Sequence, residues 1–459
     1  MSQTPATVPC LKTPLPGPLS RELIESDELF VSPSYTRFYP LAVKRASGTT
    51  LEDMDGNLFL DFTAGIAVCG TGHCHPRVVR AIQEQAGKLL HMCGADFYYP
   101  PLRDLARKLS EISPGDATKR VLFTNSGAEA IEAAIKLARY HTGRQQIIAF
   151  YGAFHGRTMG ALSLTASKIT QRCRFEPLVP GVTHVGYGHC YRCPVHLKYP
   201  SCRMACVSDI EDMLFKKLVA PEEVAAIVVE PIQGEGGYVV PPPEYHPQLK
   251  ALAEKHGILY VADEVQSGMG RTGKMFAIDH WGVVPDILCL AKGLASGMPL
   301  GAMIARGEIM DWAPGAHAST FGGNPVSCVA ALETIALLEE GLIQNAAEVG
   351  EHLITRLRGL QERHSLIGDV RGKGLMVGIE LVLDRDSRAP ATEKRDAILQ
   401  NCFRRGLVLL GCGESGIRFS PALLVTKEEV ETAQAIMEAA FHDVERQSLN
   451  STSYCVVKS

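Results

Sequence analysis

Short apolar segments alternate with helical patterns from about residue 120 onward, and this alternation constrains the fold most. The apolar segments are residues 121–124, 146–150, 225–229, 258–265 and 287–291, and residues 128–140 carry apolar side chains at helical spacing. Buried strands are short apolar runs, and parallel strands need a crossover connection, usually a helix. The pattern predicts an α/β fold with a mostly parallel sheet and helices on both faces.

The two ends of the chain have different patterns. Residues 38–61 are strand-like with a tight turn at Asp55-Gly56, residues 325–358 and 427–444 are helical, and residues 370–383 are strand-like. We expect residues 1–19 to be a loosely attached arm and Ser20 to cap a helix starting at Arg21. The predicted domains are residues 1–63 (arm and part of a small domain), 64–330 (large domain) and 331–459 (rest of the small domain).

Composition excludes several classes of protein. Of the 459 residues, 46% are hydrophobic and 21% charged, and the net charge is −4. This charge argues against nucleic-acid or anionic-membrane partners. The sequence has neither an apolar run of membrane-spanning length nor a signal-type segment at the Pro-rich N-terminus, and 14 cysteines are too few for a disulfide scaffold. We therefore expect a soluble, cytoplasmic protein.

Lys292 stands at the end of the apolar run 287–291 and is followed by glycines at 293 and 297. A lysine at the end of a buried strand loses water, which lowers its pKa and frees its amine to attack a carbonyl. A lysine whose ammonium group reaches back to solvent would give the same local pattern. Residues upstream are needed to distinguish the two.

At two places where a predicted strand ends, the following residues carry groups that are suited to binding a ligand. Residues 125–130 (Asn-Ser-Gly-Ala-Glu-Ala) join a predicted strand to a helix, whose free N–H groups and dipole favour a phosphate. An ordinary turn with a serine cap has the same sequence. After the strand at 146–150, Phe154 is suited to stacking on a flat cofactor and Arg157 to binding a carboxylate. A packed aromatic ring and a surface arginine are the alternatives.

Asp263 and Val265 lie two residues apart, so on a strand they face the same side. The aspartate is placed to hold a ring N–H⁺ while the valine packs on the ring, although an acid often ends a parallel strand without such a role. Together with Lys292, the aromatic ring and the phosphate turn, these residues match the needs of pyridoxal 5'-phosphate. The combination predicts a cofactor site at the carboxyl ends of the strands.

With these motifs the chain resembles class III pyridoxal-phosphate aminotransferases of fold type I, the group of the 4-aminobutyrate, ornithine and acetylornithine enzymes. The resemblance runs from about Phe38 to about Phe441. It is carried by Asp55-Gly56, Gly72-His73, His75-Pro76, residues 126–130, 154–158, 230–237 and 263–266, Arg271-Thr272-Gly273, Lys292-Gly293 and residues 320–325. It implies a large domain with a mostly parallel sheet of seven strands flanked by helices, and a smaller α+β domain built from both chain ends.

The resemblance also implies roles for individual residues. Lys292 is the lysine that binds the cofactor covalently and shuttles the substrate proton, and Asp263 pairs with the ring nitrogen. The ring is held between Val265 and Phe154, and Gln266 reaches its phenolic oxygen. The remaining implied cofactor-binding residues are Ser126, Gly127 and Ala128 at the phosphate, His155 in the stacking motif, and Thr320, which holds the phosphate of the neighbouring subunit.

Substrate binding follows from the same resemblance. Arg418 matches the arginine that binds an α-carboxylate, and Glu235 matches the glutamate that pairs with it when an ω-amino substrate has no α-carboxylate. Arg157 matches a position that binds the far carboxylate in 4-aminobutyrate enzymes. The expected protein is a homodimer with shared sites that moves an amino group from an ω-amino acid, such as 4-aminobutyrate or ornithine, to a 2-oxo acid such as 2-oxoglutarate.

Two other functions stay open at this point. An amino-acid racemase or epimerase on the same scaffold would also break the Cα–H bond, and would need a group such as Glu235 on the face opposite Lys292. A binding protein without turnover would keep the fold, but Lys292 and Asp263 argue against it. The switching role that Glu235 has with Arg418 favours amino transfer.

The segment after residue 186 departs from the family pattern. It holds Cys190 and Cys193, then Cys202 and Cys206, with His189 and His196 nearby. Two close cysteine pairs have a spacing seen in zinc and iron–sulfur sites, although reduced structural cysteines or a local disulfide would look the same. We therefore assign no metal ligand from the sequence.

Overall fold

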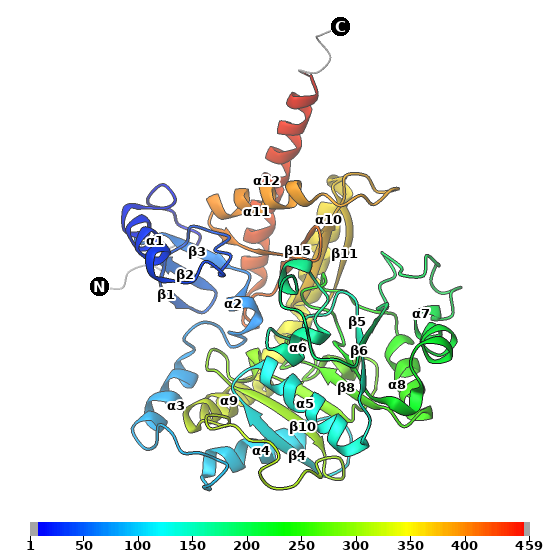
Figure 1. Cartoon of the computed structure of the whole chain (residues 1–459). Coiled ribbons are helices and arrows are strands. Elements are labelled where there is room, and N and C mark those ends of the chain that lie inside the picture. Colours follow the sequence, from blue (N-terminus) through cyan, green and yellow to red (C-terminus); the bar gives the residue numbers. More distant parts are fainter. Residues whose placement is uncertain (1–7, 454–459) are drawn as a thin grey trace.

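A sheet of seven strands forms the centre of the protein, whose computed structural model describes residues 8–453 (Figure 1). The strand order is β4 (Lys119–Thr124), β10 (Gly301–Arg306), β9 (Ile287–Leu290), β8 (Leu259–Asp263), β7 (Val224–Val229), β5 (Gln146–Phe150) and β6 (Val182–Val185). Strand β10 runs antiparallel to both of its neighbours, and the other pairs are parallel. The predicted α/β class and the mostly parallel sheet are confirmed.

Two of these strands were not expected from the sequence pattern. Strand β6 lies at the edge of the sheet, and all four of its residues are only partly buried, so it lacks a long apolar run. Strand β10 begins at Gly301 directly after a loop rich in glycine and proline, where the pattern favours a turn. Both strands therefore depend on pairing with distant segments more than on their own sequence.

Both faces of the sheet are covered, which explains the apolar strand sequences. Along β8, Leu259 and Val261 belong to one buried cluster, which includes α5 (Gly127–Thr142), while Tyr260 and Ala262 belong to the other. This alternation is the period-two geometry of a strand with a core on each side. The helices around the sheet also include α3 (Pro76–Ala86), α4 (Pro100–Ile112), α6 (Met159–Leu164), α7 (Ala205–Asp209), α8 (Tyr245–Lys255) and α9 (Pro325–Leu337).

Segments from the two chain ends form two smaller sheets, above the central sheet in Figure 1. One contains β1 (Val43–Ser47), β2 (Thr50–Asp53), β3 (Leu58–Asp61) and β13 (Leu407–Val408), and β13 runs parallel to β3. The other contains β11 (Ile367–Lys373), β12 (Met376–Leu381), β15 (Gly416–Phe419) and β14 (Leu410–Cys412). Helices α10 (Ile343–Arg363), α11 (Thr392–Arg404) and α12 (Lys427–Ser453) accompany them. The domain boundaries themselves stay a prediction.

The N-terminal segment differs from the expectation of a loose arm over its described part. Cys10 pairs with Leu58, and the N–H groups of Lys12 and Thr13 donate to the side chain of Asn57. Helix α1 (Pro18–Phe30) begins before the predicted Arg21, and Ser20 does not cap it. A distant residue, Asp55, takes the capping role by accepting from the Leu19 and Ser20 N–H groups. Residues 1–7 lie outside the described part.

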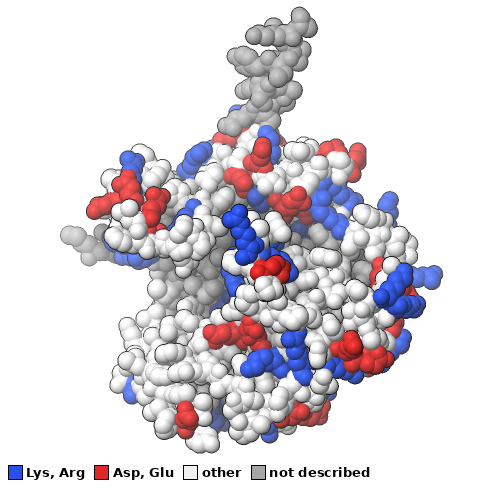
Figure 2. Space-filling model, in the orientation of Figure 1, with Lys and Arg blue, Asp and Glu red and all other residues white. Residues whose placement is uncertain are grey.

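The helical pattern predicted from Pro325 to about Arg358 is also divided. Helix α9 and helix α10 are separated at Gly341, whose φ of 157° is outside the helical region. Within residues 8–453 no helix combines the length and the apolar character needed to cross a bilayer. On the face shown in Figure 2, basic and acidic side chains are interspersed.

Candidate active site

A pocket of about 350 Å³ lies at the carboxyl ends of the central strands. Strands β8 and β9 end there, and helix α5 begins there. This is the edge at which open α/β sheets bind their ligands. The pocket is lined by Val68, Asn125, Ser126, Gly127, Ala128, Phe154, His155, Gly156, Asp263, Val265, Ala291, Lys292, Gly297, Met298, Pro299 and Leu300.

Lys292 projects into this pocket just beyond strand β9. Its backbone has a φ of 45°, a left-handed conformation that is uncommon for a residue with a side chain. Burial lowers the pKa of Lys292, and the carboxylates of Asp263 and Glu230 only partly oppose this effect. A larger fraction of the amine is therefore neutral and nucleophilic than for a lysine in water.

Asp263, at the end of β8, is held in a fixed orientation. His155 Nδ1 lies 2.6 Å from Asp263 Oδ2, and the Val265 N–H donates to Asp263 Oδ1 over 3.0 Å. Burial disfavours a charged His155 ring, but the bond to Asp263 outweighs it and raises the pKa of His155. The His155 Nε2 atom is buried without a hydrogen-bond partner. The pair therefore keeps a buried negative charge paired beside Lys292.

The junction of β4 and α5 forms the other end of the pocket. The Ser126 side chain caps the helix by accepting from the Glu129 N–H, and the first intrahelical bond runs from Ala130 N to Ser126 O. The N–H groups of Gly127 and Ala128 precede this bond, as at any helix start. A Cβ at Gly127 would lie 2.6 Å from Val265 Cγ1, so only glycine fits. The arrangement suits an anion such as phosphate.

Arg418, on strand β15, approaches the same region through Glu235. Arg418 Nη1 donates to Glu235 Oε2 over 3.0 Å, and Lys168 Nζ donates to Glu235 Oε1 over 2.6 Å. Burial raises the pKa of Glu235, but Arg418 and Lys168 outweigh it and hold the pKa below its usual value. Arg418 Nε is buried without a partner, so the guanidinium keeps a free donor. A carboxylate that replaced Glu235 would find a complete arginine fork.

Five predicted residues do not line this pocket: Glu235 and Arg418, described above, and Arg157, Thr320 and Gln266. Arg157 is exposed, with its guanidinium 5.7 Å from the centre of the Phe154 ring. Thr320 is exposed on a loop before α9, outside the pocket. Gln266 is half-buried, and its Oε1 atom has no hydrogen-bond partner. The roles predicted for these residues stay predictions.

Two residues at the site were missed by sequence reasoning. Glu230 accepts hydrogen bonds from the N–H groups of Phe154 and Gly234, at 2.9 and 2.8 Å, and so joins the stacking motif to the loop of Glu235. Burial raises the pKa of Glu230 to about 7. Lys168 holds Glu235 but lies in a stretch, Ala-Ser-Lys-Ile, without any motif. The position of Glu230 directly after an apolar strand could have predicted a role at the site, whereas nothing in the sequence around Lys168 indicates one.

Comparison with known proteins shows the family. Residues 30–441 match the model of the aminotransferase class-III family. The chain belongs to the class-III aminotransferases. It is 42% identical to an alanine/serine racemase of Pyrococcus horikoshii, covering 93% of this chain and 91% of the relative. It is 39% identical to the 4-aminobutyrate aminotransferase GabT of Escherichia coli (strain K12), covering 93% and 99%.

The fold comparison agrees. An amine transaminase from an uncultivated Pseudomonas species, solved in its PLP-bound form, superposes with a TM-score of 0.84 at 33% identity, covering 90% of this chain and 98% of that chain. The class-III aminotransferase described here is therefore a pyridoxal-phosphate-dependent enzyme of fold type I.

The residues of the pocket fit this cofactor. The glycine at 127 and the start of α5 suit its phosphate, the paired carboxylate of Asp263 suits a protonated ring nitrogen, and the half-buried Phe154 ring flanks the space between them. The unpartnered His155 Nε2 atom is a further buried polar group beside that space. When bound, the cofactor acts as an electron sink that makes the Cα–H bond of an amino substrate acidic.

Proposed function

We propose that this aminotransferase takes the amino group from an ω-amino acid, such as 4-aminobutyrate or ornithine, and passes it to a 2-oxo acid such as 2-oxoglutarate. The observation that carries the proposal is the Arg418–Glu235–Lys168 chain of ion pairs. When Glu235 pairs with Arg418, it neutralises the arginine charge, so that a donor without an α-carboxylate can bind. With Glu235 displaced onto Lys168 alone, Arg418 is free for the α-carboxylate of the 2-oxo acid.

The remaining roles follow from the positions of the side chains. We assign Lys292 Nζ the covalent attachment of the cofactor and the transfer of the substrate Cα proton, since burial lowers the pKa of its amine. Asp263 holds the ring nitrogen, with His155 orienting the carboxylate. Gly127 and Ala128 bind the phosphate through their N–H groups, and Val265 packs against the ring.

A racemase is the second candidate, supported by relatives named alanine/serine racemase and isoleucine 2-epimerase at 42% and 38% identity. Racemisation needs a second acid or base opposite Lys292. Glu235 is the obvious group, but both of its oxygens are bound by cations and its pKa is held low. A carboxylate so stabilised is a poor proton donor, which favours amino transfer.

We also infer a homodimer with shared sites. Large apolar side chains are exposed around the Thr320 loop: Leu90, Phe97, Tyr98 and Phe321 are 65%, 55%, 105% and 59% exposed. They belong to one region, because Asn324 donates to Leu90 O and Tyr99 donates to Gly323 O. Such a patch is typical of an interface. A second copy docked there would bring Thr320 towards the partner's phosphate site.

The thiols support a cytoplasmic location for the enzyme. Among the described residues, thirteen cysteines are free. Proteins that keep so many unpaired thiols are typical of reducing compartments.

The function is tested with purified enzyme loaded with cofactor, 2-oxoglutarate and a set of donors: 4-aminobutyrate, 5-aminovalerate, ornithine, N-acetylornithine and alanine. We expect glutamate to form with at least one ω-amino donor. Single-enantiomer alanine incubated without any oxo acid serves as the racemase assay. Rapid formation of the other enantiomer, with no glutamate from any ω-amino donor, would overturn the proposal.

The ion-pair chain is tested by Glu235→Gln and Lys168→Ala, with Lys216→Ala on the surface as a matched control. Glu235→Gln leaves the charge of Arg418 uncompensated when an ω-amino donor binds. We expect kcat/KM for the ω-amino donor to fall about 10- to 100-fold. This corresponds to a loss of about 1.4–2.7 kcal/mol of transition-state stabilisation, the usual cost of removing one partner of a buried charge. The half-reaction with 2-oxoglutarate should change less, and equal losses in both halves would contradict the switching role.

A further inference from the structure

Four cysteines gather in the connection between strand β6 and helix α7. Cys190 and Cys193 precede a turn, and Cys202 and Cys206 flank the start of α7, so the spacings are two and three residues within the pairs and eight residues between them. Close cysteine pairs of this kind are the usual ligands of a structural zinc ion. The short gap allows one ion to reach all four thiols.

The fold brings the two pairs together. All four cysteines line the same small cavity of about 10 Å³, together with His189 and Met204. Each pair thus lies on the wall of the cavity that the other pair lines.

The size of the cavity favours a single ion. A space of about 10 Å³ holds about one water-sized sphere, which is enough for one metal ion. The sulfurs are more open than in a zinc site. With Zn–S bonds of about 2.3 Å, thiolates on zinc lie roughly 4 Å apart, whereas among described residues no three of these sulfurs lie within 4.8 Å of one another. Binding would draw the two turns together.

The charges of the segment suit bound thiolates. Between Glu176 and Asp209 the sequence contains no acidic residue, while Arg192, Lys198 and Arg203 lie between the cysteines. Arg192 is paired with Glu380, and Glu244 adds one negative charge near Cys190. An ion with a charge of +2 held by four thiolates has a net charge of −2, which nearby cations stabilise. Each thiol gives one proton to solvent on binding, and no electron is transferred.

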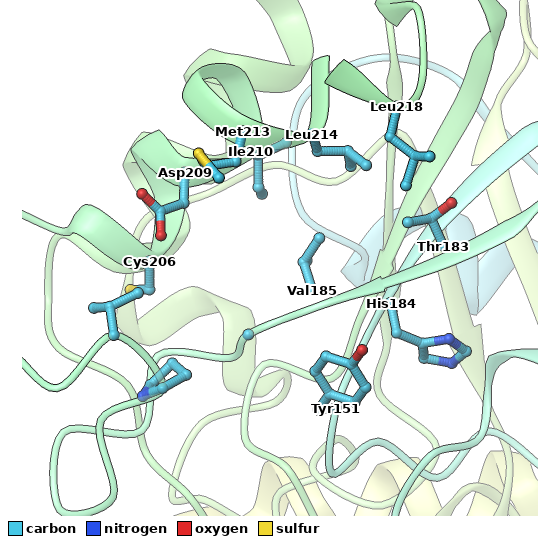
Figure 3. Close-up of a pocket in the computed structure, with 13 residues that line it drawn as sticks. Tyr151, Thr183, His184, Val185, Cys206, Asp209, Ile210, Met213, Leu214 and Leu218 are labelled. Atoms are coloured by element: carbon cyan, nitrogen blue, oxygen red, sulfur yellow. The ribbon is translucent and has the colours of Figure 1, made fainter. Parts of the chain in front are cut away.

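The segment needs an ordering element. From residue 186 to 204 it contains turns and bends but no helix or strand, and His196, Arg203 and Met204 have positive φ angles. It covers an apolar pocket of about 490 Å³ between β6 and α7, with Cys206 at its edge (Figure 3). Long irregular loops in compact domains are usually functional or held by a constraint. Tyr187 and Met204 are buried near the two ends of this segment, and the turns between them belong to no helix or strand.

The turn between Cys190 and Cys193 also makes one of the contacts between the large sheet and the sheet that contains Arg418. Between the two cysteines, Arg192 forms an ion pair with Glu380 on β12 and donates to Arg388 O over 2.7 Å. Strand β12 pairs with β15, which carries Arg418. Fixing the Cys190–Cys193 turn would therefore fix a support of the substrate-binding strand.

We propose that Cys190, Cys193, Cys202 and Cys206 form a four-thiolate site for one zinc ion, which holds the β6–α7 connection against the smaller sheet. The site is structural, since all four ligand positions are protein thiols and none is left for substrate. It does not depend on which amino donor the enzyme uses.

The test uses the full-length, cofactor-loaded enzyme and its Cys190→Ser/Cys206→Ser variant, with Cys173→Ser, an exposed cysteine outside the segment, as control. Metal analysis after incubation with zinc and desalting should give about one zinc per chain for the wild type and the control, and under a fifth of that for the double variant. Replacing zinc by Co²⁺ should give the visible bands of a tetrahedral thiolate complex in the same two proteins only.

The wild type alone also decides the question if the double variant does not fold. Titration with a mercurial reagent should release zinc in step with modification of four thiols. Absence of zinc from the wild type, an intact mass lowered by disulfide formation at these cysteines, or iron with acid-labile sulfide in place of zinc would each overturn the proposal.

Discussion

The pocket around Lys292 and the segment from Cys190 to Cys206 both gather reactive side chains, but by different means. At the pocket, Asp263 and Lys292 stand at the ends of buried strands and Gly127 at a helix start, and Asp263 and the nearby Glu230 and Glu235 have fixed hydrogen-bond partners. In the cysteine segment, Cys190, Cys193 and Cys202 lie outside helices and strands, and Cys206 lies in the short helix α7. The difference teaches that the sheet preorganises the pocket, whereas the cysteine segment needs a ligand to bring its groups together.

If this contrast is correct, changes in the pocket alter chemistry and leave stability nearly unchanged, while changes in the cysteine segment do the reverse. Both properties are measured for every variant below, by steady-state kinetics and by thermal unfolding. A pocket variant that mainly destabilised the protein, or a cysteine variant that mainly slowed turnover, would break the comparison.

The largest effect is expected for Lys292→Ala. It removes the nucleophile and proton carrier, so kcat/KM should fall by about 10³-fold or more. Because a lysine that is desolvated in the native state contributes little to stability, the melting temperature should not decrease. Lys216→Ala, a surface change, is the control and should match the wild type. Retention of more than a tenth of wild-type activity by Lys292→Ala would remove the basis for the assigned role.

A smaller effect is expected for Gly127→Ala. The new Cβ would lie 2.6 Å from Val265 Cγ1 and 3.0 Å from Val265 Cγ2, at the face where the ring of the cofactor is to pack. Overpacking of about 1–3 kcal/mol should weaken cofactor binding about 5- to 100-fold, measured by equilibrium titration of cofactor-free enzyme. Gly359→Ala, on the open side of helix α10, is the matched control and should bind the cofactor normally.

The pH dependence of cofactor capture tests the burial of Lys292. Only the neutral amine attacks the cofactor aldehyde, and burial lowers the pKa of Lys292 below the ordinary 10.5. The rate of capture by cofactor-free enzyme should therefore rise with pH and level off below pH 10.5. Stopped-flow absorbance follows the reaction. A rate that still increased through pH 10 would mean that the amine is solvated.

The smallest effect on chemistry is expected for Cys190→Ser. We expect kcat within about twofold of wild type, since the residue does not line the pocket of Lys292. Loss of a structural ligand should instead lower the melting temperature of zinc-loaded enzyme by about 2 °C, equivalent to roughly 2 kcal/mol for a chain of this size. Cys173→Ser should leave both unchanged. If the wild type had the same melting temperature with and without zinc, the cysteine segment would not need a bound ion for its stability.

Much of the fold and the cofactor end of the site was predictable because their signals are local. Five strands of the central sheet appear as apolar runs, and Lys292, Asp263 and Gly127 each stand beside such a run or a helix start. Strand β10 and edge strand β6 were missed because their burial depends on neighbours distant in the sequence. The cap that Asp55 provides for α1, 35 residues away from Ser20, was missed for the same reason.

The sequence by itself determined the α/β class, the order of the elements and the position of the nucleophilic lysine. These follow from periodicity over a few residues and from the rule that parallel strands present their carboxyl ends at one edge. Only the tertiary structure decided that Lys168 and Arg418, separated from Glu235 by 67 and 183 residues, share its carboxylate. It also decided that Arg157 is exposed and that four thiols meet in one cavity. Such contacts depend on how distant segments pack, for which a local pattern holds no signal.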